Sequence, residues 1–85
     1  MILKPLGPEV SIAAANTVTT VSNTQQQVLI RVINTGAAAV LHFANGGGEY
    51  ANLTVSNVEF VVVQKAATDT LQGAGMLAVP VAYKF

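Results

Sequence analysis

The chain has 85 residues, of which 52% are apolar and only 9% are charged, and its four positive and four negative side chains give a formal net charge of zero. An average soluble domain carries about 25% charged residues. The neutral balance opposes binding to nucleic acid, which needs a basic face, and to anionic membrane surfaces. We therefore predict neither a nucleic-acid nor a membrane partner, and so little charge predicts a surface that contacts other protein.

The small size of the chain leads to the same expectation. A domain of this length buries only roughly 60–65% of its unfolded surface and usually needs a disulfide, a metal or oligomerisation as further support. The chain has no cysteine, and His42 is its only histidine, so a disulfide and a Cys/His zinc site are excluded. We predict a homo-oligomer without a cofactor.

Residues 1–8 are predicted to form an extended arm, because Pro5, Gly7 and Pro8 oppose a helix there. Apolar side chains stand at both ends of the chain, and apolar ends are either disordered or docked. We expect them to dock on a neighbouring subunit. These side chains are Ile2, Leu3, Leu6 and Phe85.

Residues 9–85 complete a single β domain that spans 1–85. Val, Ile, Thr and Ala dominate this part, Asn and Gly punctuate it at short intervals, and helical periodicity is missing. The pattern is typical of an all-β fold, a compact antiparallel β-sandwich or barrel-like roll of about seven short strands. The first strand candidates are 10–14 and 17–22, followed by a polar loop at 23–27.

The clearest predicted hairpin joins residues 28–33 to 37–44 through Asn34-Thr35-Gly36, a three-residue loop that ends in glycine. In this register Val28 faces His42, and both sides of the ribbon are apolar. One side carries Val28, Ile30, Val32, Val40 and His42, and the other carries Leu29, Arg31, Ile33, Leu41 and Phe43. Because a sandwich strand normally has one wet side, the second side needs cover from the chain itself or from a neighbour.

A second hairpin is predicted between residues 49–55 and 58–64, with Leu53 facing Phe60 across the strands. The stretch 45–48 between the two hairpins is expected to be a flexible turn. Downstream, residues 68–73 suit an Asp-capped turn or a single helical turn closed by glycine.

The last predicted strand covers residues 77–83. Pro80 lies inside it and cannot donate a ladder hydrogen bond, so we place this strand at a sheet edge or at a bulge.

The only arginine, Arg31, lies among apolar residues on the second side of the first hairpin, as does Phe43. Arginine is enriched in interface cores, although its stem also covers apolar neighbours at ordinary surfaces. Both interpretations stay open. Our hypothesis is an interface that includes Arg31 and Phe43, in which Arg31 meets a carboxylate of another subunit. The candidate carboxylates are Glu9, Glu49 and Asp69.

The sequence does not match the residue spacing of known catalytic or nucleotide-binding motifs. Glu49 and Glu59 fall on opposite sides of the second hairpin, roughly 17 Å apart, whereas paired glycosidase carboxylates lie about 5–9.5 Å apart. No serine lies in a Gly-x-Ser-x-Gly elbow. The glycine-rich stretches 46–48 and 73–78 lack the lysine or the helix of a nucleotide-binding loop. We predict no enzymatic activity and no catalytic, metal or cofactor-binding residues.

Four stretches together resemble small all-β virion proteins of tailed bacteriophages, especially marine ones, over residues 28–84. They are Arg31-Val32-Ile33-Asn34-Thr35-Gly36, Tyr50-Ala51-Asn52, Lys65-Ala66-Ala67-Thr68-Asp69-Thr70-Leu71 and Ala78-Val79-Pro80-Val81-Ala82-Tyr83. The resemblance implies a place on the capsid surface, a trimer, and the major capsid protein or another virion protein as partner. It implies no catalytic residues.

From these observations we predict a structural virion protein, a capsid decoration (cement) protein that binds the outside of the coat lattice and stabilises it. Two alternatives stay open. One is a tail, neck or fibre component of the virion. The other is a host-surface or glycan-binding module, which should carry an aromatic cluster in its loops.

Overall fold

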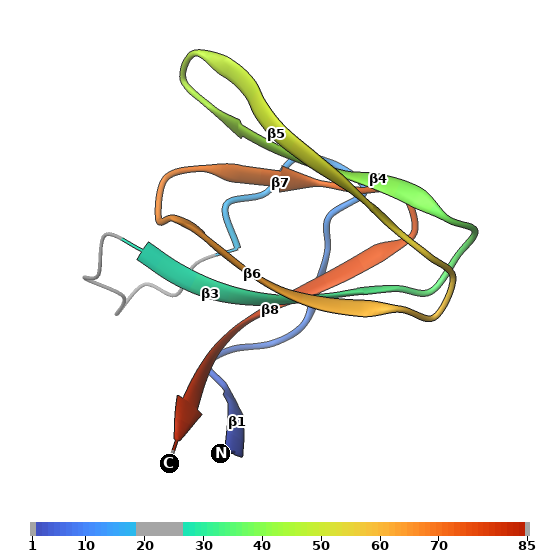
Figure 1. Ribbon diagram of the computed structural model, residues 1–85. Helices are drawn as coiled ribbons and strands as arrows, with labels where there is room; N and C mark the ends of the chain where they lie inside the picture. The colour runs from blue at the N-terminus through green and yellow to red at the C-terminus, as the bar shows by residue number, and fades with distance from the viewer. Residues whose placement is uncertain (1, 19–26, 85) are drawn as a thin grey trace.

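The computed structural model describes residues 2–18 and 27–84, which form an all-β fold of two antiparallel sheets (Figure 1). Sheet A has five strands, with the order β1-β8-β3-β6 and with β2 paired to another part of β8. Sheet B has three strands, in the order β5-β4-β7. The strands of sheet A are β1 (Ile2–Pro5), β2 (Val10–Ser11), β3 (Gln27–Asn34), β6 (Phe60–Ala66) and β8 (Met76–Lys84). Those of sheet B are β4 (Ala39–Asn45), β5 (Gly48–Val55) and β7 (Thr70–Gln72).

The predicted all-β, sandwich-like fold is confirmed. Eight strands lie within the described residues, one more than the approximate number expected. The first candidate strand, 10–14, shortens to β2, and the last one is confirmed as β8. Most of the predicted strand 17–22 and of the polar loop 23–27 lies outside the described residues.

The first predicted hairpin is wrong. Its two strands exist as β3 and β4, but β3 pairs with β6 and β8, whereas β4 pairs with β5 and β7. The reason lies in which side of each strand reaches the core. By crossing between the sheets, the chain brings Leu41 and Phe43 against the valines of β3 and turns His42 outward.

The second predicted hairpin is wrong for the same reason. β5 lies in sheet B and β6 lies in sheet A, so Leu53 faces Leu41, and Phe60 faces Ile33. The hairpin that does form joins β4 to β5 through the glycine-rich turn expected at 45–48, with Asn45 opposite Gly48. Gly48 has a φ of 107°, a conformation that side chains rarely adopt and glycine adopts freely.

Residues 68–73 were expected to form a turn, yet they contain strand β7. Leu71 faces Phe43 of β4 and is fully buried. Burial of this leucine against the sandwich core outweighs the local turn preference, as tertiary packing often does in short segments.

Strand β8 lies inside sheet A, so its predicted place at an edge is wrong. Proline is tolerated there because Pro80 faces the interval between β1 and β2. The Pro80 carbonyl accepts a hydrogen bond from Leu6 N at 2.8 Å, which places the missing N–H on the same side, away from β3.

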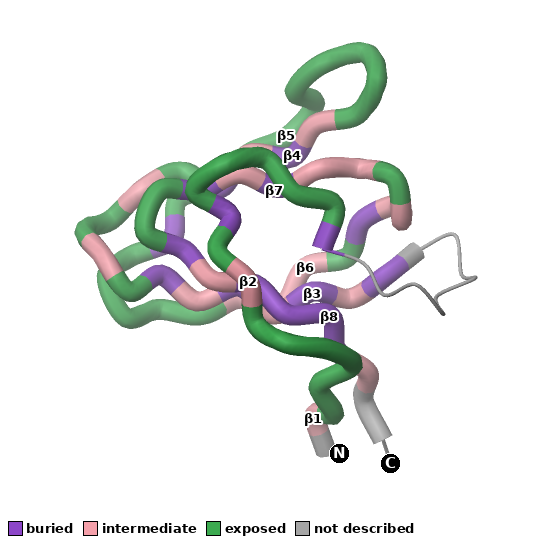
Figure 2. The backbone as a smooth tube through the Cα atoms, turned by 180° about the vertical axis from the view of Figure 1, so that it is seen from behind, coloured by how far each residue is buried: buried purple, intermediate pink, exposed green. Residues whose placement is uncertain are grey.

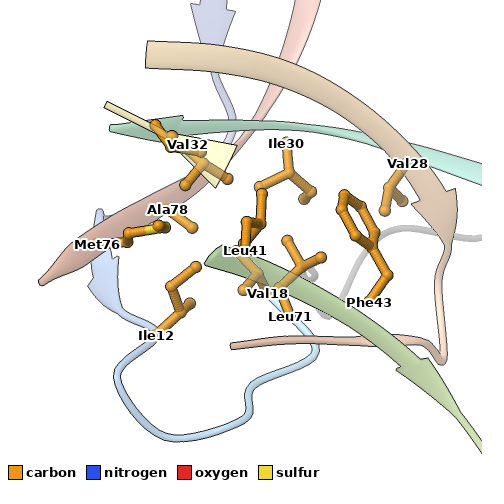
Figure 3. Close-up of a cluster of buried hydrophobic side chains, with 11 residues drawn as sticks. Ile12, Val18, Val28, Ile30, Val32, Leu41, Phe43, Leu71, Met76 and Ala78 are labelled. Carbon is orange, nitrogen blue, oxygen red and sulfur yellow. The ribbon is translucent and has the colours of Figure 1, made fainter. Parts of the chain in front are cut away.

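The core lies between the two sheets (Figure 3). Val28, Ile30 and Val32 of β3 project from sheet A toward Leu41 and Phe43 of sheet B, and all five side chains are buried. Ile12, Val18, Leu71, Met76 and Ala78 surround them. This β3 alternation is the one that the sequence predicts.

Asn34 joins the two sheets at one end of the sandwich. Its side chain is fully buried; Nδ2 donates to the carbonyl oxygens of Ala37 at 2.9 Å and Val55 at 2.8 Å, and Oδ1 accepts from Gly36 N at 2.9 Å. Gly75, with a φ of 72°, approaches Gly36 so closely that a Cβ there would lie 3.4 Å from the Gly36 backbone. The Asn34-Thr35-Gly36 stretch is therefore a crossing between the sheets that is anchored by the buried Asn34 side chain.

The N-terminal segment is extended, as predicted, but residues 2–5 pair with the chain's own last strand as β1. Figure 1 shows β1 and the end of β8 running side by side away from sheet B and from the rest of sheet A. Residues 4–9 are exposed along their length, as is the tip of the β4–β5 hairpin (Figure 2).

Candidate interaction surface

The outer side of sheet A, which faces away from sheet B, is apolar. Alternation along each strand turns Leu29 and Ile33 outward, and their cross-strand partners on β6 and β8 follow. We call this surface the apolar face. Its apolar residues are Leu3, Leu29, Ile33, Phe60, Val62, Leu77, Val79 and Val81.

Exposure varies across the apolar face. Phe60 is 60% exposed at one rim, whereas Leu29, Ile33 and Leu77 are half-buried. Toward β1, the face is hollowed into a groove of about 370 Å3 with Val79 and Val81 among its lining residues. Leu3, Pro5, Gly7, Glu9 and Arg31 also line it. A large aromatic side chain left in water beside half-buried aliphatic ones is a feature of surfaces that bind partners.

Arg31 lies in the middle of the apolar face and is paired within its own chain. Its Nη2 donates to Glu9 Oε2 at 2.7 Å, and the two side chains are 31% and 37% exposed. Glu9 is one of the three predicted partners, but the predicted contact between subunits is wrong for this carboxylate. The pair makes the charge on the apolar face formally zero. Arg31 Nε is buried without a hydrogen-bond partner among the described residues.

The outer side of sheet B differs in chemistry, and we call it the polar face. His42 Nδ1 lies 2.5 Å from Glu49 Oε1, and Asn52 Nδ2 donates to Glu49 Oε2 at 3.1 Å. The hydrogen bond from Asn52 lowers the pKa of the Glu49 carboxyl, and the contact with His42 adds to that shift. Thr54 and Gln72 extend the polar surface along β5 and β7.

Tyr50 stands at the register shift between β4 and β5 and is 50% exposed. Its hydroxyl donates to Asp69 Oδ2 at 2.6 Å, which raises the pKa of Tyr50 because the hydrogen bond favours the protonated phenol. Its ring lies 6.4 Å from that of Phe43, tilted by 56°. The hydrogen bond and the ring contact fix the base of the β4–β5 hairpin.

Lys65 is the one charged residue among the described residues that is buried, at 2% exposure. Its Nζ donates to the carbonyl oxygens of Ala66 at 3.1 Å and Ala67 at 3.4 Å. Burial lowers the pKa of Lys65, and Asp69 opposes that shift. The lysine therefore completes the turn after β6 rather than projecting from the surface.

The predicted interface residues are only partly brought together. Leu3 and Arg31 share the groove on the apolar face, Leu6 is 43% exposed beside it, and Ile2 lies in β1 opposite Lys84. Phe43 is 7% exposed in the core, so its placement on the uncovered side is wrong. Phe85 lies outside the described residues.

Sequence reasoning missed Phe60, Val62 and Leu77 as members of the apolar face. The alternation of β6 offered a signal, because Val61, Val63 and Lys65 share one side and Phe60 with Val62 the other. The assumed hairpin with β5 hid that signal by placing Phe60 opposite the core residue Leu53.

The described ranges, 2–18 and 27–84, hold no group of three or more potential metal ligands. Within the same ranges, no helix has the length and apolar character needed to cross a bilayer. Comparison with protein-family models, with curated proteins and with solved structures gave no match.

Proposed function

We propose that this chain is a structural subunit of a virion, a decoration protein that binds the outside of a tailed-phage capsid and stabilises the coat lattice. The apolar face is the observation that carries the proposal. Val79 and Val81 of this face are already buried within the chain, but Phe60 is 60% exposed and Leu29, Ile33 and Leu77 are half-buried, so apolar surface remains for another protein to cover. The resemblance of residues 28–84 to phage virion proteins supplies the particular setting.

The size of the apolar face explains why a lattice suits it. Four adjacent strands at about 4.8 Å spacing, with about six residues each in β3, β6 and β8 and four in β1 at about 3.3 Å per residue, give a face of roughly 350 Å2. Burying it against one partner removes roughly 700 Å2 in total, below the ~1,200–2,000 Å2 of a stable interface. Many such contacts on a closed shell reinforce one another through effective concentration.

The neutral Arg31–Glu9 pair suits this role. An unpaired arginine in an apolar interface would carry a large desolvation penalty, whereas a paired one can be covered at lower cost. The face can thus be buried without an acidic partner at this point.

The test is the location of the chain on virions produced by the phage that encodes it. We expect mass spectrometry to find the chain in purified particles and immunogold microscopy to place it on the head. Leu77→Ser should reduce its copy number on particles, because Leu77 lies on the apolar face away from both sheet edges. Val40→Ser, the matched change on the polar face, should not. Gold on the tail, or absence from particles, would contradict a decoration role.

The polar face favours a second candidate, a glycan-binding module. Glu49 and Asn52 are exposed on this face, and Tyr50, next to Glu49 in the chain, is half-exposed at the base of the hairpin; such groups can hydrogen-bond to and stack on sugars. Glycan-array binding that is lost with Asn52→Ala and kept with Leu77→Ser would support this candidate over decoration.

A further inference from the structure

We propose that a second copy of this chain adds to the free edge of β6, antiparallel and about a two-fold axis, so that the two apolar faces become one. The proposal rests on the proposed function and names the first partner in the assembly. The two sheets have four edges, and an unprotected edge strand is the common template for β-strand addition.

Three of the four edges are blunted. One edge of sheet A is shared by β1 and β2: β2 has only two residues, and β1 has only four, of which Lys4 and Pro5 oppose strand addition. β5 carries Glu49 and a register shift that leaves Tyr50 without an opposite residue. β7 has three residues, and Asn16 already bridges to its Leu71.

The edge formed by β6 has none of these features. It has seven residues, with no proline and no register shift against β3. Its lysine, Lys65, turns inward to the carbonyl oxygens of the following turn. No residue of 2–18 or 27–84 pairs with the far side of β6.

The hydrogen bonds to β3 determine which backbone N–H and C=O groups of β6 point to its free edge. Val58 N donates to Asn34 O at 2.9 Å and Asn34 N donates to Glu59 O at 3.0 Å, so these residues bond toward β3. Alternation along an antiparallel ladder then turns the N–H and C=O of Phe60, Val62 and Gln64 to the free edge.

A two-fold axis at Val62 pairs the free backbone groups of β6 with the free backbone groups of β6 in the second copy. Val62 then faces Val62 of the second copy, Phe60 faces Gln64, and every free N–H in this stretch meets a free C=O. An isologous contact of this kind uses one surface twice and closes with two subunits. It favours a dimer as the unit, where the resemblance implies a trimer.

Pairing also enlarges the surface available to the coat. Because directly opposite residues in an antiparallel pair point to the same side, the apolar faces of both copies join across β6. Two faces of roughly 350 Å2 give roughly 700 Å2 per dimer, and burying that area against a coat removes roughly 1,400 Å2 in total. This reaches the standard interface size that one copy alone does not.

The absence of native cysteine makes the test direct. In the proposed register the two Val62 Cα atoms lie about 5.5 Å apart, within disulfide range. Val62→Cys should therefore form a covalent dimer on oxidation with diamide at low protein concentration, whereas Thr54→Cys, an exposed position on the β5 edge, should not.

Two further variants should block the dimer without touching the bonds to β3. Val62→Lys places like charges opposite each other at the axis and should weaken dimerisation at least about tenfold in sedimentation equilibrium. Gln64→Pro removes a donor on the free edge and no hydrogen bond to β3. Thr54→Lys is the matched control and should leave the dimer intact, with circular dichroism checking the fold of each variant.

The possible results test the β6 dimer separately from the proposed decoration role. A wild-type dimer that cross-links through Val62→Cys and is lost with Val62→Lys supports the proposal. A wild-type monomer that still binds virions overturns the β6 dimer and leaves the decoration role standing. A dimer that survives Val62→Lys and Gln64→Pro forms through another surface and also overturns it.

Discussion

The outer sides of the two sheets come from similar sequence yet differ in chemistry. Sheet A turns Leu29, Ile33 and Leu77 outward, whereas sheet B turns His42, Asn52 and Thr54 outward. Each side also holds one acid paired with a base, Glu9 with Arg31 on the apolar face and Glu49 with His42 on the polar face.

The difference shows which outer side of the fold carries apolar side chains beyond those that the core needs. A sandwich of this size needs only one apolar side per sheet for its own core. The side chains of the polar face can remain exposed to water without a partner. The apolar face has a second set of aliphatic side chains that the core does not use, and that surplus is the reason to expect a partner.

The largest effect is expected where the two sheets are joined. Asn34→Ala should lower the free energy of unfolding by about 2–4 kcal/mol, because it leaves the buried carbonyl of Val55 and the N–H of Gly36 without their side-chain partner. Urea unfolding followed by circular dichroism measures it. Asn57→Ala is the control: its exposed amide donates to Gly36 O, and its loss should cost less than about 1 kcal/mol. Equal losses in the two variants would show that Asn34 does not hold the sheets together.

A stabilising change is expected at the rim of the apolar face. Val58 is 75% exposed and has a φ of 53° in the turn before β6, at a turn position that glycine usually fills. Val58→Gly should raise the free energy of unfolding by about 1 kcal/mol, since a β-branched residue is strained in the left-handed region. Thermal unfolding tests this, with Val40→Gly as a control that should destabilise because Val40 lies in a regular strand. A lower melting temperature for Val58→Gly would contradict the strain.

A smaller effect should separate the two ion pairs. Glu9→Gln leaves Arg31 charged over an apolar groove and should lower stability by about 0.2–1 kcal/mol, with less effect in high salt. Denaturant titration at low and high salt measures both. Glu49→Gln on the polar face should lower stability less than Glu9→Gln does. The reverse order would place the more important charge pair on the polar face.

The smallest effect concerns pH. Because the folded state lowers the pKa of Glu49, its contribution to stability is present above the unfolded pKa and is lost as pH falls through the folded pKa. Asn52→Ala removes the main cause and should raise the pKa of Glu49 toward its usual value. Carbon NMR titration of the Glu49 carboxyl follows the change. Thr54→Ala, nearby on the same face, should leave the Glu49 titration where it is in the wild type.

Local pattern predicted the strands better than their partners. Alternation at Val28, Ile30 and Val32, the glycine turn at 45–48 and the extent of β8 all follow from side-chain type and spacing. The partners do not, because Leu29 and Ile33 make β3 apolar on both sides, and a short link such as Asn34-Thr35-Gly36 fits a hairpin as well as a crossing. Only the fully buried Asn34 side chain, satisfied from both sheets, distinguishes the two.

The candidate surface could be predicted in part. An apolar second side on β3 was expected from Leu29, Arg31 and Ile33, and the structure places these residues on the outer side of sheet A. Phe43 was assigned to that side because the predicted hairpin between residues 28–33 and 37–44 placed it on the same side of the ribbon as Leu29, Arg31 and Ile33. Arg31 was expected to meet an acid, yet sequence spacing could not tell whether Glu9 belongs to the same chain, since the contact spans residues far apart along it.

Hydroxyl-radical footprinting of the chain, free and on the virion, compares the two faces most directly. If external protein covers the apolar face, oxidation of Phe60, Leu77 and Leu29 should fall strongly on particles, while His42 and Tyr50 on the other sheet react as in the free chain. Undiminished oxidation of Phe60 and Leu77 on particles, or protection confined to His42 and Tyr50, would contradict the account.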